Sequence, residues 1–393
     1  MPSLLQLNCT ANWGSTGKIA EGIGLAAMAR GWESAIAFGR YFNPSQSQLM
    51  KAGSHTDVYL HYARYRLFND EGLGSRRATR QLIGRIENYA PDVIHLHNIH
   101  GHWLNYPLLF EYLRSISTPI VWTLHDCWSF TGGCYHFENA GCFKWKNSCH
   151  QCGHRLKFQS DNSARNFLLK KHLFQVVGKR LTIVCVSEWL AKYVRQSLLG
   201  NCRIEVINNG IDTSVFTPSE DANHAPSIAG VSNVWTSEKG LDDFIELRRL
   251  LPEDIGITMV GLTSGQIADL PPGITGLCRT QSVDELVKIY RSANILVNPT
   301  YNDTFPTVNL EALACGTPVI TYNTGGSPEA IDHSTGIVIE KGNIEQLAAT
   351  VAAVCNGALK FSSDECRARA IRNFSQTTQF GRYIDLYHDL IRQ

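Results

Sequence analysis

Short apolar runs alternate with amphipathic stretches along the whole chain. The amphipathic stretches repeat apolar residues at helical spacing, as in residues 17–30, 240–251 and 343–354. The short runs are rich in β-branched residues and apolar on both faces, which is typical of strands buried in a parallel sheet. They cover residues 3–9, 34–40, 92–98, 119–126, 181–187, 203–209, 227–233, 256–262, 273–279, 295–300, 317–323 and 335–340. This alternation predicts an α/β fold whose parallel sheets are covered by helices on both faces.

The alternation is interrupted at residues 210–226, where turn-forming residues and two prolines replace any apolar period. We therefore expect two doubly wound, Rossmann-like domains, residues 1–209 and residues 210–375. Residues 376–393 repeat apolar side chains at helical spacing, and we expect them to form a last helix that crosses back to the first domain. Doubly wound sheets bind ligands at the carboxyl ends of their strands, so the loops after strands are where chemistry is expected.

The charge balance is close to neutral. The 393 residues include 36 basic and 35 acidic side chains, which argues against a protein that binds nucleic acid by bulk charge. No apolar run approaches the roughly 20 residues of a membrane-spanning helix. The N-terminal sequence lacks the basic head and the long apolar stretch of a signal peptide. We expect a cytoplasmic protein.

Cysteine is over-represented for that compartment, with 12 residues, five of them between Cys127 and Cys152. The cytosol keeps thiols reduced, so a cluster suggests metal ligands or reactive groups. Cys134, Cys142, Cys149 and Cys152 are separated by seven, six and two residues, and only the last pair has the spacing of a zinc knuckle. A structural zinc site would order the long loop 127–155. Free thiols are the alternative, and an iron–sulfur cluster is a weaker one.

The loop after the first strand reads Gly14-Ser15-Thr16-Gly17-Lys18 and opens the first helix. Glycines at a helix N-terminus let backbone amides approach an anion. The spacing matches neither a nucleotide-triphosphatase P-loop nor a GxGxxG fingerprint. A phosphate-binding loop and a plain helix-capping turn both remain open here.

Three residues of the second half indicate a nucleotide site. Lys239 stands at the start of a helix, where it could reach a diphosphate or simply be solvated. Asp303 and Glu311 lie eight residues apart. If a helix begins near Pro306, Asp303 is in the preceding loop and Glu311 is about one and a half turns into the helix. A carboxylate there can accept hydrogen bonds from a ribose diol, and a capped surface helix is the alternative.

The sequence resembles a known family in both halves. Residues 208–216, 237–247, 302–329 and 335–339 resemble the second domain of retaining glycosyltransferases of family 4. These enzymes adopt the GT-B fold, in which two Rossmann-like domains face a central cleft. Residues 95–109, 122–137 and 141–152 resemble the branch that builds bacterial capsule, exopolysaccharide and O-antigen repeats.

The resemblance implies a role for individual residues. Catalysis would involve His125, as the histidine directed at the donor hexose, together with Lys239, which neutralises the diphosphate, and Asp303. The donor-binding set would comprise Gly14, Gly17, Asn233, Lys239, Thr304, Phe305, Pro306 and Glu311, with Glu311 on the nucleotide ribose. The branch also carries the four cysteines 134, 142, 149 and 152. Two positions depart from the family: Asp303 replaces a glutamate, and Asn233 replaces an arginine six residues before the lysine.

The implied reaction is retaining transfer of a hexosyl or N-acetylhexosaminyl group from a nucleotide-diphosphate sugar to a polyprenyl-diphosphate-linked oligosaccharide. No catalytic cofactor is expected, and zinc would be structural. A GT-B nucleotide-sugar epimerase is the alternative among enzymes. A zinc-knuckle nucleic-acid-binding protein is the alternative from another class, and the neutral charge weighs against it.

Two basic stretches bear on the acceptor. Residues 64–85 contain six arginines, and residues 165–180 contain five basic side chains and place Phe167, Phe174 and Val177 on one helical face. They are either solvated helix surface or sites that dock the protein peripherally on the anionic cytoplasmic face of the inner membrane, where the lipid-linked acceptor resides.

Histidines and tryptophans gather in the first half. Strand alternation places His95 and His97 on one face of a strand end, where we interpret them as polar lining of a sugar site, with a metal pair as the alternative. Trp103, Trp122 and Trp128 are expected in the core, and stacking on sugar faces is the alternative.

Overall fold

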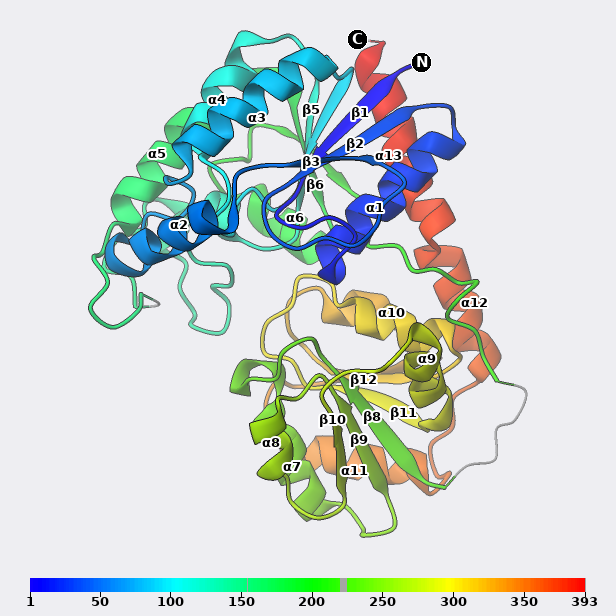
Figure 1. Ribbon diagram of the computed structural model, residues 1–393. Coiled ribbons are helices and arrows are strands. Elements are labelled where there is room, and N and C mark those ends of the chain that lie inside the picture. The colour runs from blue at the N-terminus through cyan, green and yellow to red at the C-terminus, as the bar shows by residue number, and fades with distance from the viewer. Residues whose placement is uncertain (154, 220–224, 393) are drawn as a thin grey trace. The chain divides into compact units, whose positions relative to one another are not determined.

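The computed structural model of the chain describes residues 1–153, 155–219 and 225–392. It contains two compact units, Met1–Asn208 with Phe380–Gln393, and Asn209–Gln379 (Figure 1). Residues 220–224, which belong to the predicted linker, lie outside the described residues. No helix in the described residues combines the length and the apolar composition needed to cross a bilayer.

Unit 1 is built on a seven-stranded sheet in the described part of the chain, in the order β3-β2-β1-β4-β5-β6-β7, and every pairing is parallel. Its strands are β1 (Ser3–Leu7), β2 (Glu33–Phe38), β3 (Gln48–Lys51), β4 (Val93–Leu96), β5 (Ile120–Leu124), β6 (Leu181–Cys185) and β7 (Arg203–Val206). The central strands are buried along their whole length, as continuous apolar runs require.

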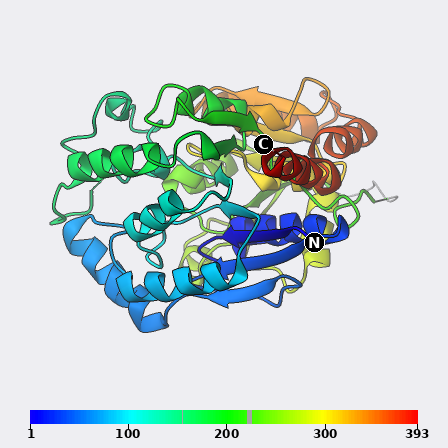
Figure 2. The same cartoon turned by 90° about the horizontal axis from the view of Figure 1, so that it is seen from above.

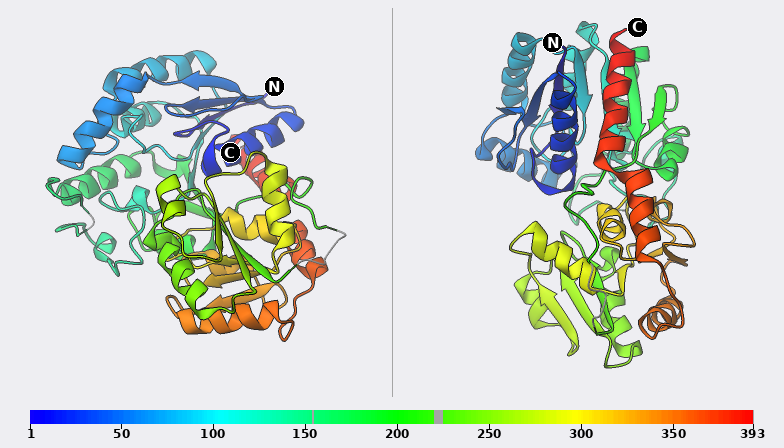
Figure 3. Two further views of the ribbon diagram at one scale, coloured as in Figure 1. Left: turned by 60° about the horizontal axis from the view of Figure 1, so that its bottom comes forward. Right: turned by 90° about the vertical axis from the view of Figure 1, so that its right-hand side faces the viewer.

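Helices cover both faces of this sheet. They are α1 (Gly14–Ala29), α2 (His55–Phe68), α3 (Arg76–Tyr89), α4 (Tyr106–Ser115), α5 (Ser163–Gln175), α6 (Glu188–Val194) and α13 (Gln376–Ile391). Figure 2 shows α3, α4 and α5 on the side of the sheet away from α13. The last helix lies beside α1 (Figure 3), where Phe380, Ile384 and Tyr387 join Ile19 and Ile23 in one buried cluster.

Across the described residues of unit 2, a six-stranded parallel sheet has the order β10-β9-β8-β11-β12-β13. Its strands are β8 (Ser227–Val231), β9 (Gly256–Val260), β10 (Ile274–Leu277), β11 (Ile295–Asn298), β12 (Val319–Tyr322) and β13 (Gly336–Ile339). Its helices are α7 (Leu241–Leu250), α8 (Ser264–Ala268), α9 (Val283–Ser292), α10 (Thr307–Ala314), α11 (Ile344–Cys355) and α12 (Ser363–Phe374).

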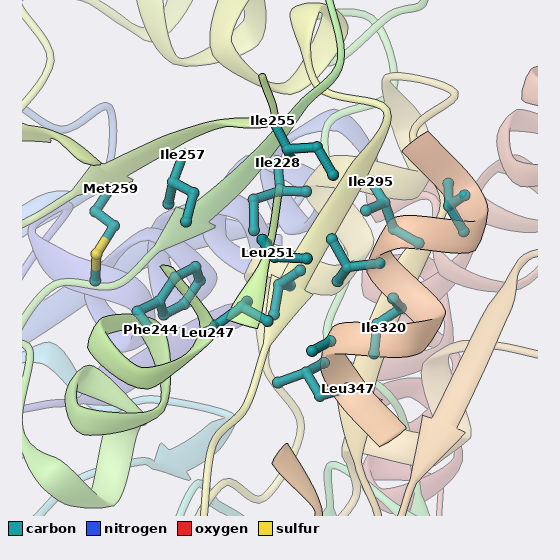
Figure 4. Close-up of a cluster of buried hydrophobic side chains, with 14 of the residues drawn as sticks. Ile228, Phe244, Leu247, Leu251, Ile255, Ile257, Met259, Ile295, Ile320 and Leu347 are labelled. Atoms are coloured by element: carbon teal, nitrogen blue, oxygen red, sulfur yellow. The ribbon is translucent and has the colours of Figure 1, made fainter. Parts of the chain in front are cut away.

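The core of unit 2 lies between the sheet and the helices α7 and α11. Figure 4 shows Phe244 and Leu247 of α7 and Leu347 of α11 pointing toward apolar side chains of the strands. Ile228 and Ile257 belong to the same cluster, and all five side chains are almost completely buried. Because the apolar sides of these helices pack on the face of the sheet, the ends of the strands and the loops after them are held in place.

The predicted α/β architecture is therefore confirmed, and all twelve predicted strands are present. In each sheet the strand order reverses once, between β1 and β4 in unit 1 and between β8 and β11 in unit 2. Doubly wound sheets bind ligands outside the carboxyl ends of the strands at such a reversal. The loops that follow these four strands are therefore the places to look for a site.

Candidate active site

The loop after β1 is closed tightly on the start of α1. Asn8 donates a hydrogen bond from Nδ2 to the carbonyl of Thr10 at 2.9 Å, and a Cβ on Gly17 would lie 2.8 Å from Oγ1 of Thr10. Only glycine fits that approach. Gly14 begins the helix with a φ of 66°, and the residue before it, Trp13, carries an indole that cannot accept a hydrogen bond from the helix amides. The first amides of α1 therefore have no side-chain cap, and they lie at the positive end of the helix, where an anion is favoured.

His125 directly follows β5 and stacks on a second histidine. Its ring lies 5.4 Å from the ring of His97, centroid to centroid, with 15° between the planes. Its Nε2 is 3.1 Å from Nδ1 of His97, whose Nε2 is 3.1 Å from Oε1 of Gln6. Burial lowers the pKa of His125 to about 4, so the ring is neutral at pH 7.

A buried ion pair lies beside it. Nε2 of His100, after β4, is 2.8 Å from Oδ2 of Asp126, after β5. Burial opposes the charged form of both groups, but their mutual attraction and hydrogen bond prevail: the pKa of His100 is raised, and that of Asp126 is held at about 2. This pair could not be recognised from the sequence, because His100 and Asp126 stand 26 residues apart and only the pairing of β4 with β5 brings their two loops together.

Glu71 is a second missed residue. Its carboxylate is buried in the loop between α2 and α3, where Oε1 accepts a hydrogen bond of 2.8 Å from the amide of Gly101. Oε2 accepts from the hydroxyl of Tyr135, and Nδ1 of His102 lies 3.5 Å from Oε1. In the sequence it is one of two acids in a stretch with six arginines, and nothing in that stretch indicates that its side chain is buried.

Of two interpretations of the first half, that of the histidines is wrong and that of the tryptophans is confirmed. His95 does not line a sugar site, because it is completely buried, with Nδ1 2.6 Å from the hydroxyl of Tyr387 and Nε2 2.8 Å from Oγ1 of Thr123. His97 is buried as well and acts on His125 instead. The three tryptophans 103, 122 and 128 are at most 2% exposed, so they fill the core, as expected by default, and do not stack on sugars.

The helix of the second basic stretch, α5, faces the core with its apolar side. Phe167, Phe174 and Val177 are at most 2% exposed, so the prediction that this face docks on lipid is wrong. Lys170 is buried too. Its Nζ donates to the carbonyl of Thr131 at 3.1 Å and lies 3.4 Å from the ring centre of Trp128, and burial lowers its pKa to about 7.

The four predicted zinc ligands, Cys134, Cys142, Cys149 and Cys152, line one small pocket. The amide of Gly132 donates to Sγ of Cys149 at 3.1 Å, as backbone amides do to thiolate ligands, while the thiol of Cys134 donates to the carbonyl of His136 at 2.7 Å. In the described residues no three histidine, cysteine or acidic side chains are grouped closely enough to hold one ion. The chemistry of the four thiols fits zinc, but the thiol of Cys134 is engaged by the carbonyl of His136.

Aromatic packing orders the cysteine loop by itself. Phe130, Phe137 and Trp145 are buried, and the ring centres of Phe137 and Trp145 lie 4.9 Å apart. Trp189 and Tyr193 of α6 extend the cluster. The loop therefore has an apolar cluster of its own besides the cysteines, and zinc stays a prediction.

In unit 2, the loops after β8 and β11 meet through Lys239 and Asp303. Nζ of Lys239 is 2.9 Å from Oδ2 of Asp303 and donates to the carbonyl of Asn302 at 2.8 Å. Oδ1 of Asp303 accepts from the amide of Phe305 at 3.2 Å. The pair is only partly exposed, whereas Asn233, in the same loop as Lys239, is exposed.

Glu311 lies in α10, which follows the loop that carries Asp303. The helix has Pro306 as its N-cap, and proline offers no side chain to cap the first amides. Thr304 and Phe305 are buried, and the carbonyl of Phe305 accepts from Nδ2 of Asn209 at 2.9 Å. Oε2 of Glu311 accepts a hydrogen bond of 2.7 Å from the hydroxyl of the buried Tyr290 of α9, which the sequence did not suggest. One carboxylate oxygen is thereby held in place.

Two family models match successive parts of the chain: "Glycosyltransferase Family 4" over residues 23–215 and "Glycosyl transferases group 1" over residues 225–356. The chain is similar along most of its length to the "Putative colanic acid biosynthesis glycosyl transferase WcaC" of Escherichia coli (strain K12). The two are 24% identical over 371 residues, which cover 88% of this chain and 89% of that protein.

Solved structures share the fold at low identity. The sucrose-phosphate synthase of Thermosynechococcus elongatus matches with a TM-score of 0.74 and 15% identity over 100% of both chains. Anabaena Alr3699/HepE in complex with UDP matches with a TM-score of 0.66 and 14% identity, over 99% of this chain and 100% of that one. With its two parallel-sheet units and its matches to both family models, the chain belongs to the family 4 glycosyltransferases of the GT-B fold.

Proposed function

We propose that this protein is a retaining glycosyltransferase that assembles a surface-polysaccharide repeat. It would move a hexosyl or N-acetylhexosaminyl group from a nucleoside-diphosphate sugar to a polyprenyl-diphosphate-linked oligosaccharide. The relative named for colanic acid biosynthesis and the similar fold solved with UDP support this assignment. The observation that carries it is the pairing of Lys239 with Asp303 at the strand-order reversal of unit 2, in the loop that leads into the helix α10 with its half-buried Glu311.

The donor would bind along α10. Lys239 supplies a positive charge to the diphosphate, whose negative charge competes with that of Asp303 for the ammonium group. The first amides of α10 add hydrogen-bond donors at the positive end of the helix. Glu311, with one oxygen held by Tyr290, accepts hydrogen bonds from the ribose diol through its carboxylate.

The reaction needs charge stabilisation more than a strong base. The bond between the anomeric carbon and the diphosphate oxygen breaks on the face where the acceptor hydroxyl forms the new bond, and a diphosphate oxygen takes the hydroxyl proton. Lys239 and the helix amides stabilise the charge that develops on the leaving group. His125 is neutral at pH 7 because of its burial, so it serves to position the hexose by hydrogen bonding.

Replacing one residue tests the assignment. Lys239→Ala should lower transfer by about 100- to 1000-fold, the usual effect of removing one stabilising donor, without lowering the melting temperature. Lys288→Ala, which removes an exposed lysine of α9, is the matched control and should leave transfer unchanged. Near-normal transfer by Lys239→Ala would overturn the role of this lysine.

A panel of nucleotide sugars separates the remaining alternatives. The proposal expects hydrolysis of one donor and, with acceptor, a product that keeps the anomeric configuration. Release of an epimerised sugar without acceptor would indicate an epimerase. Thermal stabilisation by oligonucleotides, with none by nucleoside diphosphates, would indicate a nucleic-acid-binding protein.

A further inference from the structure

Three exposed aromatic side chains lie together at the carboxyl edge of the unit 1 sheet. Trp13 follows β1, and Tyr41 and Phe42 follow β2; their exposed fractions are 45%, 48% and 52%. All eight tryptophans lie within the described residues, and Trp13 is the exposed one among them, since the other seven are buried or half-buried. Scattered exposed aromatics are common on protein surfaces, but three adjacent ones on two neighbouring loops are not.

The two loops are held rigidly against each other. A parallel bridge joins Ala11 to Phe42: the amide of Ala11 donates to the carbonyl of Tyr41 at 3.1 Å, and the amide of Asn43 donates to the carbonyl of Ala11 at 3.1 Å. Nδ2 of Asn43 also donates to the carbonyl of Asn12 at 2.8 Å. The backbone that carries the aromatic side chains is therefore already ordered. Binding of a ligand to them costs little conformational entropy for ordering the two loops.

Two of the rings, those of Trp13 and Tyr41, contact each other, while Phe42 packs separately. The ring centres of Trp13 and Tyr41 are 4.8 Å apart with 37° between the planes, and the guanidinium of Arg40 lies 5.3 Å from the ring centre of Tyr41. Phe42 is anchored on the buried Phe38, with 5.1 Å between the ring centres. Flat apolar area thus stands next to a cation that can donate hydrogen bonds.

This surface adjoins the candidate active site directly, because Trp13 is the residue that precedes Gly14 and the first amides of α1. A pyranose ring has the matching chemistry: one face of C–H groups to lie on the rings, and hydroxyls at its edge for a donor such as Arg40. We propose that Trp13 and Tyr41, with the exposed Phe42 on the same loop as Tyr41, form a platform on which a pyranose of the acceptor glycan stacks. This inference rests on the proposed glycosyltransferase function.

Fluorescence tests the platform without requiring turnover. Because Trp13 is the exposed tryptophan, acrylamide should quench it first, and Trp13→Phe should remove that quenchable component. The probes are octyl glycosides of glucose, galactose, mannose and N-acetylglucosamine, each below the concentration at which it forms micelles. At least one of them should protect Trp13 from quenching, and octyl tri(ethylene glycol), which has the chain without the sugar, should not.

Variants add a second measurement. Tyr41→Ala should raise the glycoside concentration needed for protection by about three- to tenfold, the contribution of one aromatic contact. It should also raise the acceptor KM while hydrolysis of the donor in the absence of acceptor is unchanged. Phe158→Ala removes another strongly exposed aromatic of unit 1 and is the matched control, expected to behave as the unmodified protein does.

The outcomes separate the platform from the enzyme assignment. If no octyl glycoside protects Trp13 while a nucleoside diphosphate still raises the melting temperature, the platform is overturned and the proposed function stands. Equal protection by octyl tri(ethylene glycol) would also overturn it, because the surface would then bind apolar chains. If glycosides protect Trp13 and no nucleotide binds, the platform stands as a sugar site and the transferase proposal fails.

Discussion

Nε2 of His125 lies 3.1 Å from Nδ1 of His97, and this contact fixes which nitrogen of each ring carries the proton. Nε2 of Gln6 donates to the carbonyl of Ala20 at 2.7 Å, so Oε1 of Gln6 is the atom that faces Nε2 of His97. An oxygen can only accept, so His97 carries its proton on Nε2. Burial keeps both rings neutral by lowering their pKa values, so Nδ1 of His97 accepts from Nε2–H of His125. His125 is therefore the Nε2–H tautomer, with Nδ1 as its acceptor atom.

Gln6→Leu should disturb this tautomer without touching His125. Once the acceptor is lost, His97 can carry its proton on Nδ1 and donate to His125, which reverses the hydrogen bond. We expect transfer to fall by about 10- to 100-fold, the range for groups that orient a metal-ligating histidine. Nitrogen NMR of labelled histidine should show the unprotonated nitrogen of His125 moving from Nδ1 to Nε2. An unchanged histidine spectrum would contradict the argument, and the exposed His172→Gln is the control.

His61 makes the stability of unit 1 depend on pH. Its Nε2 accepts hydrogen bonds of 3.1 Å from the amides of both Gly72 and Gly74, which requires an unprotonated nitrogen. Burial lowers its pKa to about 4, below the value of about 6.5 in an unfolded chain. The unfolded state therefore binds the proton first. The stabilisation from this group is complete above pH 6.5 and is lost as the pH falls toward 4, by at most about 1.4 kcal/mol per pH unit.

The measurement is the denaturant midpoint of unit 1 between pH 7.5 and 5. The buried residues His95, His97 and His125 act in the same direction as His61, because their pKa values are lowered as well. His100 opposes them, since its pKa is raised. His61→Gln should be less stable at pH 7.5 but should lose less stability on acidification, whereas His172→Gln should follow the unmodified protein. Equal pH slopes in all three proteins would be inconsistent with a neutral His61.

Tyr290 should tune nucleotide binding through Glu311. Tyr290→Phe removes the hydrogen bond of 2.7 Å to Oε2, so the carboxylate is less well oriented toward a ribose diol. We expect the Kd for UDP or GDP, whichever binds more tightly, to rise by about two- to tenfold, the contribution of one hydrogen bond. Calorimetry on Tyr290→Phe, Glu311→Gln and the double variant checks this. If the two effects add fully, Tyr290 does not act through Glu311.

The strands that could be predicted from the sequence are those whose side chains are buried on both faces of the sheet. Strands buried on both faces are continuous apolar runs, which is why twelve of them were found. The strand β3 was not predicted, because its four residues, Gln48 to Lys51, lie at the edge of the sheet and the first and last of them are polar. Helical periodicity identified the apolar face of α5, but periodicity alone does not distinguish a face that packs on the core from one that meets a membrane.

The site shows the same limit. Lys239 and Glu311 could be chosen as candidates from sequence motifs, because each motif is a continuous segment that leads into one helix. The partners Asp126 of His100 and Tyr290 of Glu311 come from other segments, and only strand pairing or helix packing brings them into contact. Glu71 could not be recognised as buried from its neighbours in sequence, because the groups that bind it lie 30 and 64 residues away.

We predict that the pocket lined by Cys134, Cys142, Cys149 and Cys152 binds one zinc ion. Protein purified without chelator should then contain about one equivalent of zinc, and less than about half an equivalent would favour free thiols. Cys152→Ser should lose the metal and lower the melting temperature. Cys278→Ser, which changes an exposed cysteine of unit 2, should do neither. Since aromatic packing already orders the loop, we expect the metal-free protein to stay folded and only its loop to become more accessible to protease.

Membrane docking, if it occurs through unit 1, should involve α2. This helix exposes Leu60 and Leu67 at 61% and 60%, together with Tyr59 and Phe68, and buries only His61. Arg64 and Arg66 lie on the same exposed helix. Apolar side chains beside arginines have the chemistry to insert at an anionic lipid surface.

The double variant Leu60→Asp with Leu67→Asp should therefore abolish sedimentation with vesicles that contain anionic phospholipid. Leu168→Asp, at an exposed position of α5, is the matched control and should still bind. Binding of the unmodified protein should weaken as salt is raised, because the arginine contribution is screened. Equal loss in both variants would show that an added negative charge on either helix is enough to abolish binding, and binding that survives in the double variant would show that α2 does not dock; either result contradicts the assignment to α2. Because none of the three positions lies in the candidate active site, hydrolysis of a soluble donor should be unchanged in both variants, which separates lost docking from lost folding.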